Sequence, residues 1–135
     1  DTMSNLLKDK KIKNIKLPVS APFHSSLMSK ATEIMKKELL NINFENSKKI
    51  LISNVTADEI KNVNDLKKLL IDNIEKKVRW RESIINMNKE NITDFIEIGP
   101  GKVLSGMVKR TVKNINCFSI NSIDDMKKTI NELKK

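Results

Sequence analysis

Residues 17–28 read LPVSAPFHSSLM, and the rest of the chain is organised around this stretch. It contains two of the three prolines and the only histidine, and it joins a short apolar segment to a long helical pattern. Pro18 and Pro22 fix their own φ angles and push the residue before each of them toward extended geometry. The sequence therefore predicts a stiff strand-to-helix turn that holds Phe23 and His24 in place.

His24 is the first candidate for chemistry, because an imidazole can accept and release a proton near neutral pH. Ser25 or Ser26 can cap the helix that follows, and apolar residues recur at helical spacing from Leu27 to Leu39. His24 is thus expected at the entrance of an amphipathic helix. The alternative is that His24 is a structural residue at a helix start.

The remaining pattern alternates between strands and helices, which indicates an α/β fold with a largely parallel sheet. Short apolar or alternating segments predict strands over residues 13–20, 49–55, 94–98 and 116–120. Helical spacing predicts a helix end over 1–11 and helices after 25, after a cap at Asn64 or Asp65, after 80, after 102 and after Ser122.

A glycine-rich turn, Gly99-Pro100-Gly101, follows the predicted strand 94–98. Such a turn can cradle an anion with backbone N–H groups. The same residues also suit any sharp turn, so a structural role is preferred to the anion cradle, which stays open as the alternative. Gly106 completes the set of three glycines and is expected to let a helix approach its sheet.

The formal net charge of +9 is compatible with nucleic acid, anionic lipid or an acidic protein as partner. The basic residues are mostly scattered lysines, with arginine only at Arg79, Arg81 and Arg110, and tyrosine is absent. This composition argues against a protein that binds single-stranded nucleic acid, which needs aromatic side chains for base stacking. Two interpretations stay open: a solvated surface shaped by AT-rich coding, or a basic docking face.

The only cysteine, Cys117, excludes an intrachain disulfide and a thiolate zinc site, and its apolar surroundings predict a small buried side chain. No apolar run approaches the roughly 18 residues that span a bilayer. The first residue is Asp1, so the chain is expected to be part of a longer protein.

The stretch around His24 closely resembles the segment around the catalytic histidine of the malonyl-CoA:acyl carrier protein transacylases and related acyltransferase domains. Val78-Arg79-Trp80 with Ser83, and FIEIGPGKVL over residues 95–104, resemble the same family in the same order. The match covers only the C-terminal half of that family. It implies that residues 21–135 are the C-terminal part of a large α/β-hydrolase-like acyltransferase domain with a largely parallel sheet. Residues 1–20 would then end a small ferredoxin-like subdomain.

The resemblance implies that His24 belongs to a Ser-His dyad and that the backbone carbonyl of Arg79 holds its ring. It also implies that Phe23 crowds the space of a 2-methyl group and so favours malonyl, although Phe23 as plain core is an alternative. The family's nucleophilic serine, in a Gly-His-Ser-x-Gly elbow, has no counterpart in this chain. The chain alone is therefore expected to be inactive.

The function implied is transfer of malonyl from coenzyme A to the phosphopantetheine thiol of acyl carrier protein in type II fatty-acid synthesis. The expected partners are malonyl-CoA and an acidic acyl carrier protein, with no metal or further cofactor, no nucleic acid and no membrane. The parent is expected to be monomeric, in the bacterial cytoplasm or an apicoplast-type plastid. The alternatives are a polyketide synthase acyltransferase domain and a non-catalytic basic binding module for RNA or an acidic protein.

Overall fold

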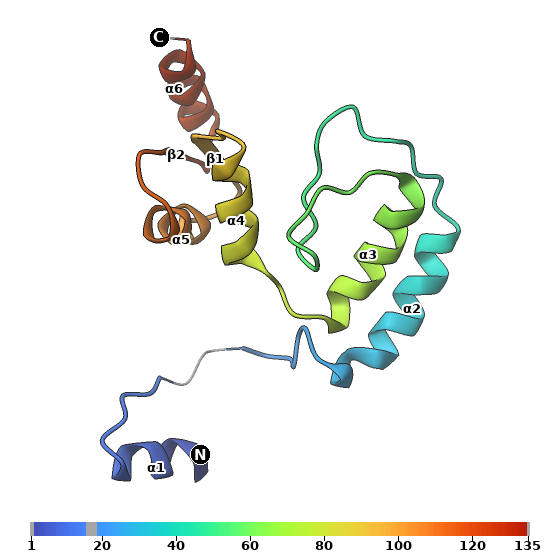
Figure 1. Ribbon diagram of the computed structural model, residues 1–135, viewed down its shortest axis with the longest axis vertical. Coiled ribbons are helices and arrows are strands. Elements are labelled where there is room, and N and C mark those ends of the chain that lie inside the picture. Colours follow the sequence, from blue (N-terminus) through green and yellow to red (C-terminus); the bar gives the residue numbers. More distant parts are fainter. Residues whose placement is uncertain (1, 16–18, 135) are drawn as a thin grey trace.

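The computed structural model describes residues 2–15 and 19–134. Figure 1 shows helix α1 at one end, the helices α2 and α3 as a pair, and the two strands together with α4, α5 and α6. The elements in chain order are α1 (Thr2–Asp9), the 3-10 turn η1 (Ser26–Met28), α2 (Ser29–Leu40), α3 (Val63–Glu75), α4 (Trp80–Lys89), β1 (Asp94–Ile98), α5 (Val103–Thr111), β2 (Asn116–Ile120) and α6 (Ile123–Leu133).

The two strands form a parallel sheet in which Asp94 pairs with Asn116 and Ile98 pairs with Ile120. Parallel neighbours need a crossover, and α5 supplies it as the helix between β1 and β2. Both α5 and α6 contact the sheet. The prediction of an α/β fold with a parallel sheet is confirmed, and the strands over 94–98 and 116–120 have the predicted bounds.

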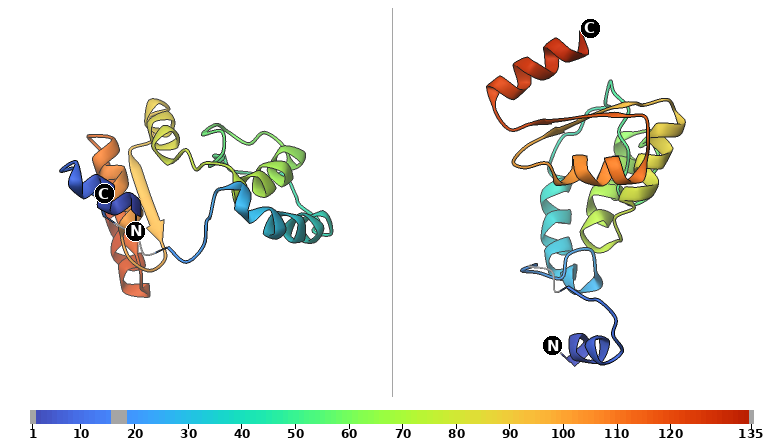
Figure 2. Two further views of the ribbon diagram at one scale, coloured as in Figure 1. Left: turned by 90° about the horizontal axis from the view of Figure 1, so that it is seen from below. Right: turned by 90° about the vertical axis from the view of Figure 1, so that its left-hand side faces the viewer.

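The helix pair α2 and α3 carries the His24 turn at one end, and Figures 1 and 2 both show the two helices side by side. Of the two predicted N-caps, Ser25 or Ser26, the structure has Ser25, whose hydroxyl accepts the N–H of Leu27 at the start of η1. The α-helix α2 follows η1 directly, and Met28 at its own N-cap position makes no side-chain cap. The predicted cap of α3 was wrong by two residues or more. Asn62, whose side chain accepts the N–H of Asp65, caps that helix instead.

Two predicted strands are absent from the described residues. Residues 49–55 form only a single antiparallel bridge, between Ile52 and Glu59, and Ile50 is 72% exposed. Residues 13–15 and 19–20 are not strand, whereas 16–18 of the same prediction lie outside the described residues. An apolar run becomes a strand only beside a strand that takes up its backbone hydrogen bonds, and the described chain places none beside these two segments.

The core of the described chain is small. Its buried apolar side chains are Leu39, Ala57, Ile84 and Val108, whereas many large apolar side chains are exposed. On β1, Ile98 is 81% exposed and Ile96 is 45% exposed, on the face opposite to Glu97, which contacts α5. A strand of a parallel sheet is normally covered on both faces, so one face of this sheet is open in the chain as it stands.

None of the described helices has the length and apolar character that crossing a bilayer requires. The boundary between residues 1–20 and 21–135 stays a prediction.

Candidate active site

His24 lies on the turn that precedes η1, and the last turn of α3 holds it by two backbone carbonyls. Its backbone N–H donates to the carbonyl of Ile74 at 3.1 Å, and its ring Nδ1 lies 2.7 Å from the carbonyl oxygen of Asn73. These carbonyls are available because the last four carbonyls of a helix have no partner within it. One end of α3 therefore fixes both the backbone and the ring of His24.

The Asn73 contact selects one form of the neutral imidazole. A carbonyl oxygen only accepts, so Nδ1 must carry the proton in this hydrogen bond. The lone pair of the neutral ring then lies on Nε2. Among the described residues no hydrogen-bond partner occupies Nε2, so this nitrogen is free to take a proton.

The local sequence explains why the turn has this shape. His24 adopts a left-handed backbone conformation with φ of 60°, which costs a non-glycine residue energy. The hydroxyl of Ser25 donates to the carbonyl of Pro22 at 2.8 Å and so closes the turn around His24. Together with the two α3 carbonyls, this bond holds the strained conformation in place.

The prediction that the Arg79 carbonyl holds the His24 ring is wrong for the structure described here. That carbonyl accepts both the N–H and the hydroxyl of Ser83, each at 3.0 Å, and so belongs to the first turn of α4. The N–H of Arg79 donates to the carbonyl of Asn54 at 2.7 Å, and its guanidinium lies 3.6 Å from Glu82. The Arg79 carbonyl is already hydrogen-bonded within the first turn of α4, whereas the last carbonyls of α3 have no partner inside their own helix.

Phe23 is 59% exposed, so in this chain its ring is not part of the core. It directly precedes His24, at the same turn. The structure thus places the ring where it is available to contact something other than this chain's own core.

The Gly99-Pro100-Gly101 turn has a structural role. Gly99 and Gly101 have φ of 139° and 94°, a region that side-chain-bearing residues avoid. The N–H of Gly101 donates to the side-chain oxygen of Asn121, which follows β2. The turn therefore fastens the end of β1 to the end of β2.

The N–H groups at the start of α5 are also occupied, because the Glu97 carboxylate accepts from Leu104 at 3.1 Å and from Ser105 at 2.8 Å. The Ser105 hydroxyl donates to the same carboxylate and lies 3.0 Å from the Ser119 hydroxyl. These bonds, that of the Ser105 hydroxyl first, lower the pKa of Glu97 below its ordinary value. Of the two interpretations of this turn, the anion cradle is not supported.

Glu97→Gln is expected to lower the urea midpoint of the chain at pH 7, since a glutamine side chain lacks the charge that strengthens the bonds to Ser105. The pKa of Glu97 is depressed in the folded state, so its contribution is present above the unfolded value of 4.5. It is lost as the pH falls through the folded value. Urea midpoints of both proteins measured from pH 7 downward should begin to converge below pH 4.5 and meet below the folded value; a constant difference would contradict this account.

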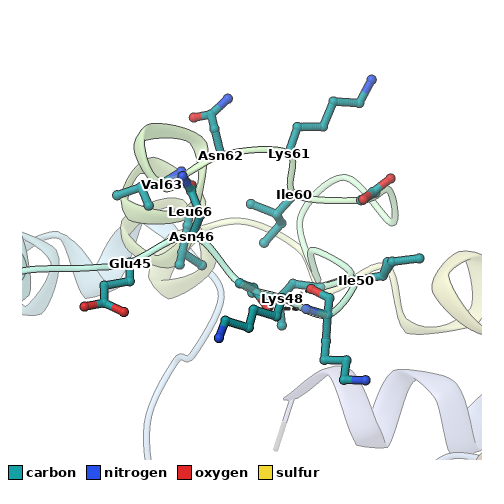
Figure 3. A pocket seen from close by; sticks show the side chains of 13 residues that line it. Glu45, Asn46, Lys48, Ile50, Ile60, Lys61, Asn62, Val63 and Leu66 are labelled. Atoms are coloured by element: carbon teal, nitrogen blue, oxygen red, sulfur yellow. Dashed lines mark hydrogen bonds between the residues drawn. The ribbon is translucent and has the colours of Figure 1, made fainter.

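Three further observations point to no additional reactive group or ligand site. Burial raises the pKa of the Cys117 thiol, which suits the predicted small apolar side chain rather than a nucleophile. No group of three potential metal ligands occurs among the residues that the structure describes. A hollow of about 200 Å³ lies between residues 45–51 and 59–63, and Figure 3 shows Glu45 and Lys61 extending from it in opposite directions. These two oppositely charged side chains therefore do not face a common ligand position.

No protein-family model matches the chain. The chain is 40% identical over 121 residues to the malonyl CoA-acyl carrier protein transacylase of Bacillus subtilis, which covers 90% of this chain and 38% of that protein. It is 37% identical over 112 residues to the protein of that name from Synechocystis, which covers 83% of this chain and 38% of the relative. The chain thus spans less than half the length of these relatives.

The fold of this chain is also similar to solved structures of transacylases. The malonyl CoA-acyl carrier protein transacylase from Clostridium perfringens superposes with a TM-score of 0.85 at 35% identity, over 96% of this chain and 41% of that one. The acyl-carrier-protein-S-malonyltransferase from Bartonella henselae superposes with a TM-score of 0.87 at 32% identity, over 99% of this chain and 43% of that one. A malonyl-transacylase solved in complex with its type II polyketide acyl-carrier protein superposes with a TM-score of 0.85 at 25% identity, over 95% of this chain and 42% of that one.

Proposed function

Because this chain is homologous to part of the malonyl CoA-acyl carrier protein transacylases, we propose that it is the histidine-bearing part of such an enzyme. The observation that carries the proposal is the pinned ring of His24, with Nδ1 held by the Asn73 carbonyl and Nε2 free. The proposed reaction moves malonyl from coenzyme A to the phosphopantetheine thiol of an acyl carrier protein. It requires that transfer depend on His24 in a full-length enzyme that carries this chain.

In the first half-reaction, Nε2 of His24 takes the proton of a serine hydroxyl outside this chain as the oxygen attacks the thioester carbonyl. The carbon–sulfur bond breaks, and the sulfur of coenzyme A leaves with the proton that His24 returns. Positive charge that develops on the ring meets the Asn73 carbonyl at the C-terminal end of α3, where the helix dipole is negative.

In the second half-reaction, His24 takes the proton of the carrier's phosphopantetheine thiol, and the thiolate attacks the malonyl ester. The ester carbon–oxygen bond breaks, and His24 returns the proton to the serine oxygen. Each half-reaction exchanges an acyl group between oxygen and sulfur with no change of oxidation state. The proposed reaction therefore needs no redox cofactor, and malonyl-CoA enters it only as a substrate.

Phe23 is proposed to set the acyl preference, because its exposed ring directly precedes His24. In a full-length enzyme, Phe23→Ala is expected to relax discrimination against methylmalonyl-CoA. A methyl group that meets an apolar pocket wall is worth roughly 10- to 200-fold in kcat/KM. The kcat/KM ratio of malonyl-CoA to methylmalonyl-CoA should therefore fall at least about 10-fold.

Leu27→Ala is the matched control for Phe23→Ala, since Leu27 is also exposed, at 77%, and lies on the adjoining 3-10 turn. It should leave the kcat/KM ratio unchanged. An unchanged ratio in Phe23→Ala as well would show that the ring does not contact the acyl group.

We further propose an acidic acyl carrier protein as acceptor, which is supported by the homologous transacylase solved with its carrier protein. The relatives compared above are bacterial, so a bacterial cytoplasm is the preferred compartment, and the plastid stays a prediction. The carrier in that complex serves type II polyketide synthesis, so a polyketide role is the second candidate. Transfer rates to fatty-acid and polyketide carrier proteins, compared side by side, would distinguish the two.

A further inference from the structure

The side chain of Asn73 has an unpaired acceptor beside His24. Its Oδ1 atom is buried and has no hydrogen-bond partner among the described residues. The backbone carbonyl of the same residue lies 2.7 Å from Nδ1 of the His24 ring. Buried side-chain oxygens nearly always accept a hydrogen bond, so an exception beside a candidate catalytic group points to a missing partner.

The sequence of α3 makes a polar residue at this position unexpected. Asn73 follows three apolar residues at helical spacing, so all four side chains share one face of the helix: Leu66, Leu69 and Leu70. A leucine at position 73 would continue this apolar stripe without burying an unpaired oxygen. The asparagine costs the desolvation of its amide, which a hydrogen bond from another group would offset.

The His24 turn has no donor left for the Asn73 side chain. Figure 1 shows the end of α3 beside this turn, which leads into α2. The backbone N–H of His24 donates to the Ile74 carbonyl, and the ring N–H donates to the Asn73 carbonyl. The next N–H along α3, that of Lys76, donates to the Asp72 carbonyl. These donors are therefore used by backbone carbonyls.

The part of the enzyme that carries the serine must come close to Asn73. In the proposed reaction, the serine hydroxyl lies within hydrogen-bond distance of Nε2 of His24. The other nitrogen of the same ring is bonded to Asn73. The serine-bearing part is thus separated from Asn73 by little more than one imidazole ring, and it can supply a donor to Oδ1.

A buried water is the other source of a donor, and such a water typically makes about three hydrogen bonds. Besides Oδ1 of Asn73, the one buried side-chain polar atom left unpaired in the described part of the chain is Nε1 of Trp80. The described residues thus offer a water at most two unpaired partners. This favours a donor from the serine-bearing part.

We propose that Asn73 is a positioning residue that acts through its side chain, an inference that rests on the proposed function. Its Oδ1 accepts a hydrogen bond from the serine-bearing part, and this bond fixes the last turn of α3. Helix ends fray, and α3 ends two residues after Asn73, so the carbonyl that holds Nδ1 needs such support. The base is then fully oriented only when both parts of the enzyme are in contact.

The test is Asn73→Leu in a full-length transacylase that carries this chain, because leucine keeps the backbone carbonyl and suits the apolar stripe. We expect kcat for malonyl transfer to fall about 10- to 100-fold, the cost of a displaced catalytic group, with KM for malonyl-CoA unchanged. Asn73→Gln retains an amide oxygen and should recover most of kcat. Asn64→Leu, the same exchange at an exposed position of α3, should change neither constant.

A second measurement uses the 135-residue chain alone, in which Oδ1 has no partner to lose. Asn73→Leu should there leave the urea midpoint unchanged or raise it. A lowered midpoint would show that a water or another group already satisfies Oδ1 within the chain, and it would overturn the inference.

Two kinetic results would also overturn the inference: a normal kcat for Asn73→Leu, or an Asn73→Gln enzyme that is as slow as Asn73→Leu. Asn73→Ala removes the same oxygen without adding volume, so it replaces Asn73→Leu in this comparison if circular dichroism shows that the leucine variant does not fold. Failure of the proposed function is distinguishable, because His24→Ala would then transfer malonyl as fast as the wild type.

Discussion

His24→Ala in a full-length transacylase that carries this chain is expected to lower kcat for malonyl transfer by about 10²- to 10⁴-fold. This corresponds to roughly 3 to 5 kcal/mol of transition-state stabilisation. The physical reason is that alanine removes the Nε2 lone pair that takes the proton of the attacking hydroxyl or thiol. Steady-state transfer of malonyl from coenzyme A to holo-acyl carrier protein measures the loss.

Alanine also removes the hydrogen bond to Asn73 and fits poorly at a backbone φ of 60°, so a second variant is needed. His24→Asn is the matched control, because asparagine tolerates the left-handed conformation but cannot act as a base at neutral pH. We expect His24→Asn to be as slow as His24→Ala while its urea midpoint stays close to that of the wild type. Near-normal transfer by His24→Asn, with a lowered midpoint, would make His24 a structural residue.

The chain alone is expected to transfer no malonyl above background, because it has a base but no activated serine. Ser25 is the nearest hydroxyl in sequence, but it donates to the Pro22 carbonyl and accepts from the Leu27 N–H, so it is part of the turn. The measurement is intact-mass analysis of the chain after incubation with malonyl-CoA, with a full-length homologue as control. A covalent malonyl adduct on the isolated chain would contradict this expectation.

The sequence predicts the β1–α5–β2 unit correctly because everything that forms it is local. Both strands and the crossover helix lie within residues 94–120, so each strand finds its partner nearby. The cap at Ser122 is correct for the same reason, since its hydroxyl accepts the N–H of Asp125 three residues on. Patterns that are satisfied by near neighbours can be recognised from the chain alone.

The predicted strand over 49–55 failed where the described chain offers no partner, and so did the described residues 13–15 and 19–20 of the strand predicted over 13–20. Ile50, which a buried strand would cover, is largely exposed, and Ser53 instead closes a turn with Ala57 and Asp58. Apolar periodicity reports what a segment can bury, but a strand also needs a neighbour for its backbone groups.

The location of His24 in a turn before a helix was predicted from its sequence, whereas the group that orients it was not. Every residue has a backbone carbonyl, so the identities of Asn73 and Arg79 do not indicate which of the two orients the ring. The usable signal is structural: α3 ends at Glu75, and the carbonyls of its last turn must find donors outside the helix. His24 supplies two of these donors.

The ring tautomer of His24 tests the central claim most directly, and the chain contains only this one histidine, so its signals need no assignment. Long-range ¹⁵N–¹H correlation spectra of the ¹⁵N-histidine-labelled chain, recorded well above the pH at which the ring is protonated, report which nitrogen carries the proton. We predict a protonated Nδ1 and an unprotonated Nε2, as the Asn73 carbonyl requires. A ring protonated on Nε2, or one averaging between the two forms as a free imidazole does, would contradict the oriented base.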